Sequence, residues 1–350
     1  MTASLIRVLV VDDSAFARKV VREILASSPL VDVVGTARDG EEALEMAERL
    51  RPDLVICDLR MPRLDGVGFV RRQMEVRPLP ILIVSAAAQD AAEVVEALSA
   101  GAIDAIQKPS AMATDDLRSI RRTLLQHVRE AMQVPVANLV RQRPPAVVPE
   151  RPAAIVAPPA VNVDLIVIGI STGGPQALRY LLPQFAANFP VPIAVVLHMP
   201  LGYTALFAEK LNEVCALEVK EAADGDVVRP GRILLAAAGR HLVFERRPNG
   251  EVVAQLPLQP LEKIHRPSVD VMFKSAAEVY SDRVLGVVMT GMGDDGKEGS
   301  AWIKAKGGCV MTEAEKSCVI YGMPRSVEEA GLSDSVVPLE EMAAAIIARL

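Results

Sequence analysis

The sequence predicts two doubly wound α/β domains joined by a Pro-rich linker, and three observations support this prediction. The chain has 350 residues, more than the roughly 100–200 of one typical domain. Apolar strand-like runs alternate with amphipathic helical patterns on both sides of a proline-rich stretch. Hydrophobic residues make up 51% of the chain and charged residues 23%, which is enough apolar mass for two cores. We expect domains at 1–130 and 163–350 and a linker at 131–162.

The composition excludes several classes of protein. The formal net charge is −6, so no global positive field attracts nucleic acid or an anionic membrane. No apolar run approaches the roughly 18 residues that span a bilayer, and the run 5–11 ends in two aspartates, unlike a secretory signal. The four cysteines form no C-x-x-C pair and indicate neither a disulfide framework nor a zinc site. We expect a cytoplasmic protein that is neither an integral membrane protein nor a nucleic-acid binder.

Prolines locate the linker. Seven of the 25 prolines lie between residues 131 and 163: Pro135, Pro144, Pro145, Pro149, Pro152, Pro158 and Pro159. Proline fixes φ and removes a backbone donor, so this stretch continues neither a helix nor a central strand. The alternative is an irregular loop inside one domain, but structureless loops beyond about 15 residues are uncommon. We therefore expect a semi-rigid, extended connection.

The N-terminal domain shows five strand–helix repeats. Strands are predicted at 5–11, 31–36, 54–58, 80–84 and 102–106, with a last helix at about 115–132. Strands that are apolar on both faces are typical of a doubly wound parallel sheet, here of the flavodoxin-like kind. In the strand order 2-1-3-4-5, ligands bind in the crevice between the carboxyl ends of strands one and three.

The C-terminal domain is predicted to be doubly wound as well. Its predicted strands lie near 164–169, 192–197 and 284–289, and its helices near 175–186, 203–213 and 295–306. Between 217 and 256 the pattern becomes hairpin-like, with the turn dipeptides Asp224-Gly225 and Asn249-Gly250. We therefore expect a mostly parallel sheet with an antiparallel excursion.

Three carboxylates are expected in the crevice of the N-terminal domain. Asp12 and Asp13 follow the first strand, and Asp58 ends the third. Such groups repel one another unless a cation neutralises them, and Mg²⁺ suits a site with few protein oxygens and room for phosphate and water. Any one of these aspartates alone is as easily a helix cap. Ser85 ends the fourth strand and Lys108 follows the fifth, which adds a hydroxyl and an ammonium to the same edge.

This set, together with Met61-Pro62 and Asp65-Gly66, resembles the receiver domain of two-component response regulators over about residues 4–130. The resemblance implies that Asp58 accepts a phosphoryl group from a histidine kinase. It also implies that Asp12 and Asp13 hold Mg²⁺, and that the phosphoryl group is contacted by Ser85 and Lys108.

One position departs from the receiver pattern. Receivers often carry an aromatic switch residue three positions before the lysine, and here that position is Ala105. We therefore do not expect phosphorylation to be coupled through a rotating aromatic ring.

A serine lies on a strand-to-helix turn in the C-terminal domain. Gly169-x-Ser171-x-Gly173 ends a predicted strand and begins a helix, a context in which glycines permit a tight turn that exposes the hydroxyl. The N–H of Thr172 would form half of an oxyanion hole. A phosphate-binding loop is the main alternative. A dinucleotide site is disfavoured because Ser171 replaces the middle glycine and the next strand ends in His198 instead of an acid.

A histidine and an acid complete a possible triad. His198 ends the strand after Ser171 and could act as its general base, although a lone histidine there is more often structural. The loop 290–296 follows a third strand and carries Asp294 and Asp295, either of which could orient the imidazole or cap a helix. The order Ser, His, Asp differs from that of α/β-hydrolases, so that fold is not expected.

Several long motifs resemble the catalytic domain of the chemotaxis protein-glutamate methylesterases, the CheB family: 164–175, 198–200, 266–270, 290–296 and 317–325. By position, the resemblance implies Ser171 as nucleophile, His198 as base and Asp295 as the orienting acid. It implies that two N–H groups stabilise the oxyanion, those of Thr172 and Met292. His265 would line the site without being the base, and we interpret His241 as a surface or structural residue.

The resemblance also implies a substrate and a mode of regulation. The substrate would be a glutamate γ-methyl ester on a chemoreceptor, hydrolysed with release of methanol, and receptor glutamines would be deamidated by the same groups. The unphosphorylated receiver would cover the catalytic cleft until Asp58 is phosphorylated. The esterase chemistry itself would need no cofactor.

Other classes of function fit less well. A ligand-binding scaffold would use the serine loop to bind anions without hydrolysing esters. A transcription regulator would need a basic recognition helix after the linker, which the sequence does not contain.

Overall fold

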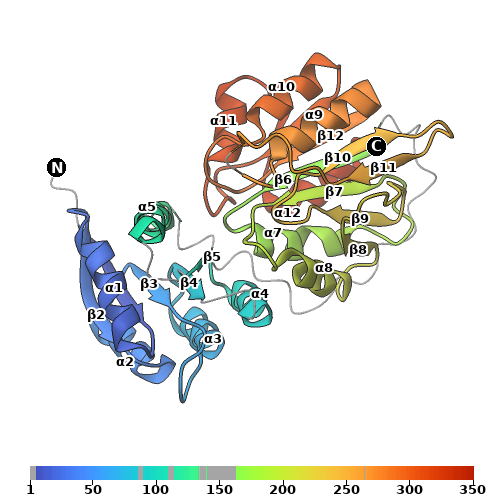
Figure 1. Ribbon diagram of the computed structural model, residues 1–350. Coiled ribbons are helices and arrows are strands. Elements are labelled where there is room, and N and C mark those ends of the chain that lie inside the picture. Colours follow the sequence, from blue (N-terminus) through green and yellow to red (C-terminus); the bar gives the residue numbers. More distant parts are fainter. Residues whose placement is uncertain are drawn as a thin grey trace. The chain divides into compact units, whose positions relative to one another are not determined.

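The computed structural model describes residues 5–85, 90–108, 114–132, 134, 139, 163–263 and 265–350. The chain divides into two compact units, Met1–Arg141 and Gln142–Leu350, which are described separately below (Figure 1). Of the predicted linker 131–162, all but four positions lie outside the described residues. Within the described residues, none of the helices combines the length and the apolar character that crossing a membrane requires.

The first unit contains a five-stranded parallel sheet in the order β2-β1-β3-β4-β5, the predicted strand order. Its strands are β1 (Ile6–Val11), β2 (Val31–Ala37), β3 (Leu54–Cys57), β4 (Ile81–Ser85) and β5 (Asp104–Gln107). All of β3 and β4 is buried, because helices cover both faces of the sheet. The register places the carboxyl ends of β1 and β3 side by side, with Val11 opposite Cys57.

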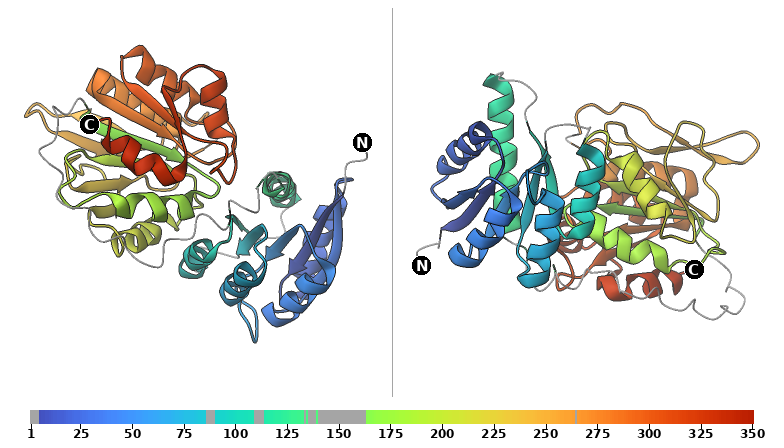
Figure 2. Two further views of the ribbon diagram at one scale, coloured as in Figure 1. Left: turned by 180° about the vertical axis from the view of Figure 1, so that it is seen from behind. Right: turned by 90° about the horizontal axis from the view of Figure 1, so that it is seen from below.

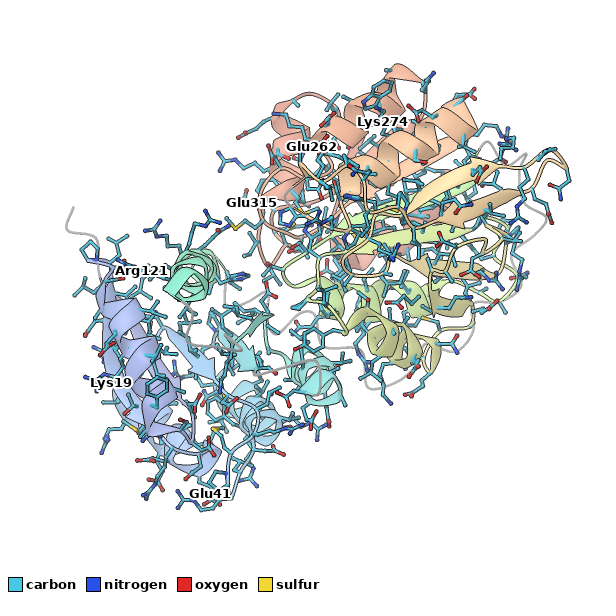
Figure 3. All side chains as sticks on the ribbon, viewed as in Figure 1. Lys19, Glu41, Arg121, Glu262, Lys274 and Glu315 are labelled. Atoms are coloured by element: carbon cyan, nitrogen blue, oxygen red, sulfur yellow. The ribbon has the colours of Figure 1, made fainter. Side chains whose placement is uncertain are left out.

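Helices cover both faces of this sheet in the part of the unit that the structure describes (Figures 1 and 2). On one face α1 (Ala15–Ala26) contacts α5 (Thr114–Ala131); on the other, α3 (Gly66–Val76) contacts both α2 (Gly40–Leu50) and α4 (Ala91–Ala100). Charged side chains lie on the outer surfaces of the helices, as Figure 3 shows for Lys19, Glu41 and Arg121. The fold is therefore the doubly wound arrangement that the sequence predicted.

The second unit contains a seven-stranded sheet in the order β14-β13-β12-β6-β7-β9-β8. The strands are β6 (Leu165–Ile170), β7 (Ile193–Leu197), β8 (Glu218–Glu221), β9 (Arg232–Leu235), β12 (Val284–Val288), β13 (Cys309–Glu313) and β14 (Ser335–Val337). Every residue of β6, β7 and β12 is buried, so the three central strands form the middle of the core.

Helices cover both faces of this sheet as well (Figures 1 and 2). One face carries α9 (Val269–Tyr280), α10 (Lys297–Ala305) and α11 (Met323–Glu329). The other carries α7 (Gly174–Leu181), α8 (Thr204–Asn212) and α12 (Leu339–Ile347). Gly169 in β6 lets α9 approach closely, because a Cβ there would lie 2.8 Å from Val269 Cγ2.

The predicted antiparallel excursion is a separate two-stranded sheet. The strands β10 (Val243–Arg246) and β11 (Val252–Gln255) pair antiparallel across the turn at Asn249-Gly250, as predicted. The prediction that Asp224-Gly225 turns a hairpin is wrong, because β8 and β9 on either side of it are parallel. The segment that crosses between them binds β11 instead: the N–H of Gly225 donates to Ala254 O at 2.8 Å.

Candidate active site

Three neighbouring strands of the seven-stranded sheet end at one edge. Ser171 follows β6 and His198 follows β7, and the His198 N–H donates to Ile170 O at 3.1 Å. On the other side of β6, the Ser171 N–H donates to Thr290 O at 3.0 Å. Thr290 follows β12 in the loop that also carries Asp295. Backbone hydrogen bonds therefore bring the three predicted site segments together.

Glycines allow the turn at Ser171 to form. Gly173 has a φ of +79°, a left-handed conformation that favours glycine. A Cβ at Gly173 would also lie 2.6 Å from Val319, and a Cβ at Gly291 would lie 2.8 Å from Ser171 Cβ. The absence of a side chain lets Val319 pack against Gly173 and lets the loop after β12 approach Ser171 at Gly291.

Asp295 orients His198. The His198 Nε2–H donates to Asp295 Oδ2 at 2.9 Å, which assigns the proton to Nε2 because a carboxylate only accepts. Nδ1 of the neutral ring is then an acceptor; it is buried and has no hydrogen-bond partner in the part of the chain that the structure describes. No hydrogen bond joins Ser171 Oγ to His198 among the described residues, and Ser171 is partly exposed.

The carboxylate of Asp295 lies at the N-terminus of α9. Besides His198, it accepts the Ser268 O–H at 2.8 Å and the N–H groups of Val269 and Asp270 at 2.8 and 2.9 Å. Burial acts to raise the pKa of Asp295, but the bonds from His198 and the helix N–H groups outweigh it and hold the pKa well below its ordinary value. Asp295 is therefore ionised although only 8% of it is exposed.

Asp270, in the first turn of α9, makes the corresponding contact with the start of α10. Its Oδ1 accepts the N–H groups of Gly296 and Gly299 at 2.9 and 2.8 Å, and Lys263 Nζ lies 3.1 Å from its Oδ2. Burial raises the pKa of Asp270. The starts of α9 and α10 are thus each capped by an acid from the other's segment, which fixes the loop of Asp295. The neighbouring Asp294 is exposed, so Asp295 is the acid of this pair that contacts His198.

Two further histidines lie near this site. The His265 ring stacks on His198 with centroids 4.1 Å apart and planes 12° apart. Burial and the neighbouring His198 lower the pKa of His265 to about 4, so this ring is neutral at pH 7. His241 is fully buried; its Nδ1 accepts the Ser268 N–H at 3.3 Å and its Nε2–H donates to Pro260 O at 3.0 Å. The surface position considered for His241 is therefore wrong, and its role is structural.

Thr172 follows Ser171 in the chain, and Met292 lies in the loop after β12 that borders Ser171. Thr172 is buried, and its carbonyl accepts the Thr290 hydroxyl at 3.0 Å. Met292 is half-buried and follows Gly291, whose Cα approaches Ser171. That the N–H groups of Thr172 and Met292 stabilise an oxyanion stays a prediction.

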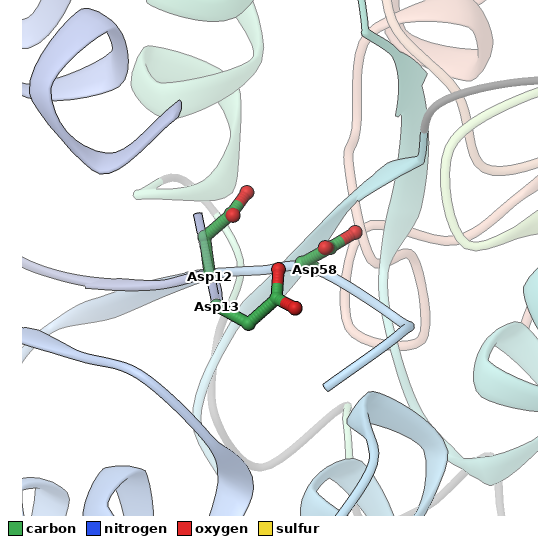
Figure 4. Close-up of side chains that lie close together, drawn as sticks. All are labelled: Asp12, Asp13 and Asp58. Atoms are coloured by element: carbon green, nitrogen blue, oxygen red, sulfur yellow. The ribbon is translucent and has the colours of Figure 1, made fainter. Parts of the chain in front are cut away.

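The first unit has its own cluster at the ends of β1 and β3. Oxygens of Asp12, Asp13 and Asp58 all lie within 4.8 Å of one another (Figure 4). Lys108 Nζ lies 2.7 Å from Asp12 Oδ2 and 2.9 Å from Asp58 Oδ2. Burial raises the pKa of Asp58 even though Lys108 opposes this, so the pocket favours a neutralising partner for that carboxyl. Three hard oxygen ligands in this arrangement fit Mg²⁺.

Ser85 and Ala105 lie on the neighbouring strands β4 and β5 of the first sheet. Ser85 is buried and its hydroxyl donates to Asp90 Oδ2 at 2.7 Å. Asp90 also pairs with Arg60 at 2.8 Å. Pro109, which follows Lys108, lies outside the described residues. Ala105 on β5 is buried and presents no ring at this position.

Comparisons with known proteins place the chain in a family. The family model of the CheB methylesterase matches residues 166–346. The chain belongs to the CheB methylesterase family. The response regulator receiver model matches residues 8–121, and together these matches confirm the predicted resemblance, fold class and hydrolase type.

Individual relatives match this chain over nearly its whole length. The Myxococcus xanthus protein-glutamate methylesterase/protein-glutamine glutaminase 5 is 50% identical over 97% of this chain and 96% of its own length. A Thermotoga maritima protein of the same name is 40% identical over 97% and 96%. The crystal structure of the Thermotoga maritima CheB methylesterase catalytic domain matches with a TM-score of 0.52 and 40% identity, covering 54% of this chain and 99% of that one.

Sequence reasoning missed several residues that support the sites of this CheB methylesterase. Ser268 and Asp270 hold the Asp295 loop, and Asp90 holds Ser85. The sequence did indicate a role for Ser268 and Asp270, because Ser-Val-Asp at the beginning of an apolar helical pattern is typical of a helix start. A cavity of about 510 Å³ beside Asp295 was also not predicted; it is lined by His265, Ser268 and charged residues that include Glu262 and Lys297.

Proposed function

We propose that this chain hydrolyses glutamate γ-methyl esters of chemoreceptors, releasing methanol, and deamidates receptor glutamines, with Ser171, His198 and Asp295 as the catalytic residues. One observation carries the assignment of roles: His198 Nε2 is held by Asp295, while Nδ1 is a buried acceptor at the strand end beside Ser171. A general base needs this combination of a fixed tautomer and an available lone pair.

In the first half of the reaction, a rotation of the Ser171 side chain brings Oγ to His198 Nδ1. Oγ attacks the ester carbonyl carbon while Nδ1 takes the hydroxyl proton. Negative charge develops on the carbonyl oxygen, where the N–H groups of Thr172 and Met292 stabilise it. The imidazolium then protonates the departing methoxide, so that methanol leaves and a glutamyl ester remains on Ser171.

In the second half, water gives a proton to His198 Nδ1 and attacks the glutamyl ester. Collapse of the intermediate returns the proton to Ser171 Oγ and releases the receptor carboxylate. Asp295 stays ionised throughout and stabilises the imidazolium through the Nε2–H bond, for which its low pKa suits it. A glutamine side chain offers the same carbonyl, with ammonia as the leaving group.

We infer that the first unit regulates this activity as a receiver. Asp58 would accept a phosphoryl group from a histidine kinase, and Asp12, Asp13 and Asp58 would hold Mg²⁺, which supplies positive charge for the transfer. Lys108 already contacts two of these carboxylates. We further infer that Ser85 contacts the phosphoryl group, for which its hydroxyl must leave Asp90.

The domain limits and location follow from the same proposal. The receiver would occupy 1–130, a Pro-rich linker 131–162 and the esterase 163–350. The family relation supports a chemoreceptor as substrate, a histidine kinase as phosphodonor and a place in the cytoplasm.

Methanol release from methylated receptor membranes tests the proposed function. Replacing Ser171 with Ala should reduce the rate by at least about 10⁴-fold, since residues of a triad act as a unit. Ser27→Ala, an exposed serine that ends α1 in the other unit, is the matched control and should retain full activity. Methanol release by Ser171→Ala at the wild-type rate would refute the assignment.

A further inference from the structure

A fully buried carboxyl lies behind the turn of Ser171 and has no part in the reaction described above. Glu313 is the last residue of β13 and is 0% exposed. Its Oε2 accepts the Thr290 N–H at 2.9 Å, and its Oε1 accepts the Ser317 O–H at 2.9 Å. Burying a carboxylate costs free energy that hydrogen bonds from neutral donors offset only in part, so this residue calls for an explanation.

Thr290 connects Glu313 to the residues that surround the nucleophile. Its carbonyl accepts the Ser171 N–H at 3.0 Å, and its hydroxyl donates to Thr172 O at 3.0 Å. The same hydroxyl oxygen accepts the Ile320 N–H at 3.0 Å, which adds the loop after β13. Thr290 itself is fully buried. Thr290 thus links the Glu313 carboxyl to the backbone of Ser171 and Thr172 and to the loop of Ile320.

We propose that Glu313 is a positioning residue for ester hydrolysis: through Thr290 it holds the backbone of Ser171 and Thr172, and its charge state sets how easily the oxyanion forms beside them. The proposal rests on the proposed function of this site. A carboxylate close to the oxyanion repels it, whereas a neutral carboxyl keeps the same bond to Thr290 without the repulsion.

The surroundings of Glu313 accommodate either charge state. As a carboxylate it accepts from both Thr290 and Ser317. As an acid it can still accept from Thr290 through Oε2 and donate its own proton to Ser317 Oγ. The Ser317 hydroxyl then turns to Ala314 O, which lies 3.1 Å away. No buried group loses its partner in this exchange, so protonation need not disturb the fold.

The charge of Glu313 changes near neutral pH. Burial raises the pKa of Glu313 to about 7, although the bonds from Thr290 and Ser317 act to lower it. The titratable groups that face it from neighbouring elements are Glu340 on α12, whose charge raises the pKa further, and Cys318, whose contact lowers it. The neutral form is therefore populated below pH 7 and the anion above it.

The variant Glu313→Gln imitates the neutral form, because its amide can accept from Thr290 and donate to Ser317. We would measure kcat and KM for methanol release by the full chain from pH 6 to 9, with saturating phosphodonor, for this variant and wild type. The ratio of the two kcat values cancels effects of pH on the receiver and on His198. The matched control is Glu329→Gln, an exposed acid on α11.

We expect the kcat ratio of wild type to Glu313→Gln to be near one at pH 6 and to fall to about one tenth by pH 8.5, with its midpoint near pH 7 and KM unchanged. Glu313→Ala, which leaves the Thr290 N–H without an acceptor, should lower kcat about 10- to 100-fold at every pH. Glu329→Gln should give a ratio of one throughout.

A ratio that stays flat across the pH range would overturn the role of the charge in this proposal. If Glu313→Ala folds and keeps wild-type kcat per active enzyme, the positioning role is refuted. Should Glu313→Ala fail to fold, the pH dependence of the kcat ratio between Glu313→Gln and wild type still tests the role of the charge. Absence of methanol release by wild type would instead refute the proposed function itself, so the two failures are distinguishable.

Discussion

Replacing Asp295 with Asn tests the link between hydrogen bonding and catalysis most informatively. In the wild type, Oδ2 accepts from His198 and Val269, and Oδ1 accepts from Ser268 and Asp270. Asparagine has one oxygen and one NH₂ group, so one of these two pairs loses its acceptor. His198 can adapt by moving its proton to Nδ1 and accepting from the amide at Nε2. The NH₂ group should therefore turn toward His198.

The consequence for catalysis is large, because a proton on Nδ1 removes the base that Ser171 needs. A triad histidine in the wrong tautomer costs about 10⁴-fold in kcat, or about 5.5 kcal/mol. The N–H of Val269 would also face an NH₂ group, and the helix start would lose a negative charge. These losses should lower the free energy of unfolding by about 2–4 kcal/mol. KM should change little, since the proposed role of Asp295 is to orient His198 and stabilise its cation.

The assay is methanol release under single-turnover conditions, with ¹⁵N NMR of His198 to report which ring nitrogen carries the proton. Asp294→Asn is the matched control: it changes the same residue type one position away, where the side chain is exposed. It should retain wild-type kcat within about twofold. If Asp295→Asn keeps kcat within tenfold of wild type, or if Asp294→Asn shows the larger loss, the assignment of Asp295 is refuted.

Three further predictions concern neighbouring groups. Ser268→Ala removes the hydrogen bond from the Ser268 hydroxyl to Asp295, so the free energy of unfolding should fall by about 1.5–3 kcal/mol in denaturant titrations; unchanged stability would contradict this. The pKa of Glu313 is raised from 4.5 to about 7, so its contribution to stability is present below pH 4.5 and lost as pH rises through 7. Glu313→Gln should therefore unfold with a free energy about 3 kcal/mol higher than wild type at pH 8 and equal to it near pH 4, in denaturant titrations. Chelation of Mg²⁺ with EDTA, or Asp58→Asn, should remove stimulation by a small-molecule phosphodonor while basal methanol release continues; persistent stimulation would contradict the role of Asp58.

The sheet order of the first unit and the location of its carboxylates could be predicted because parallel strands place their carboxyl ends at one edge. Asp12 and Asp58 follow strands that turned out to be neighbours. The same reasoning placed Ser171 and His198 on adjacent strands of the second unit. Short local sequence patterns encode where each strand ends, and the parallel topology of the sheet then brings those ends to the same edge.

Other features depend on contacts that local patterns do not encode. Asp294 and Asp295 are consecutive, and which one faces His198 depends on how the starts of α9 and α10 cap each other across 25 residues or more of sequence. The turn at Asp224-Gly225 looks like a hairpin turn, yet the crossing segment pairs with β11 instead of with its own flanking strand. Glu313 had no predicted role, because its partner Thr290 lies in the loop after β12, 23 positions earlier.

The account depends most on covalent attack by Ser171, and mass spectrometry of acid-quenched enzyme measures it directly. Mixing the full chain with a methylated receptor fragment should give, within one turnover, a glutamyl adduct on the peptide that contains Ser171. The adduct should be absent from Ser171→Ala and should not build up in His198→Ala. Methanol release without any adduct in the wild type, or an adduct on a different residue, would contradict the mechanism.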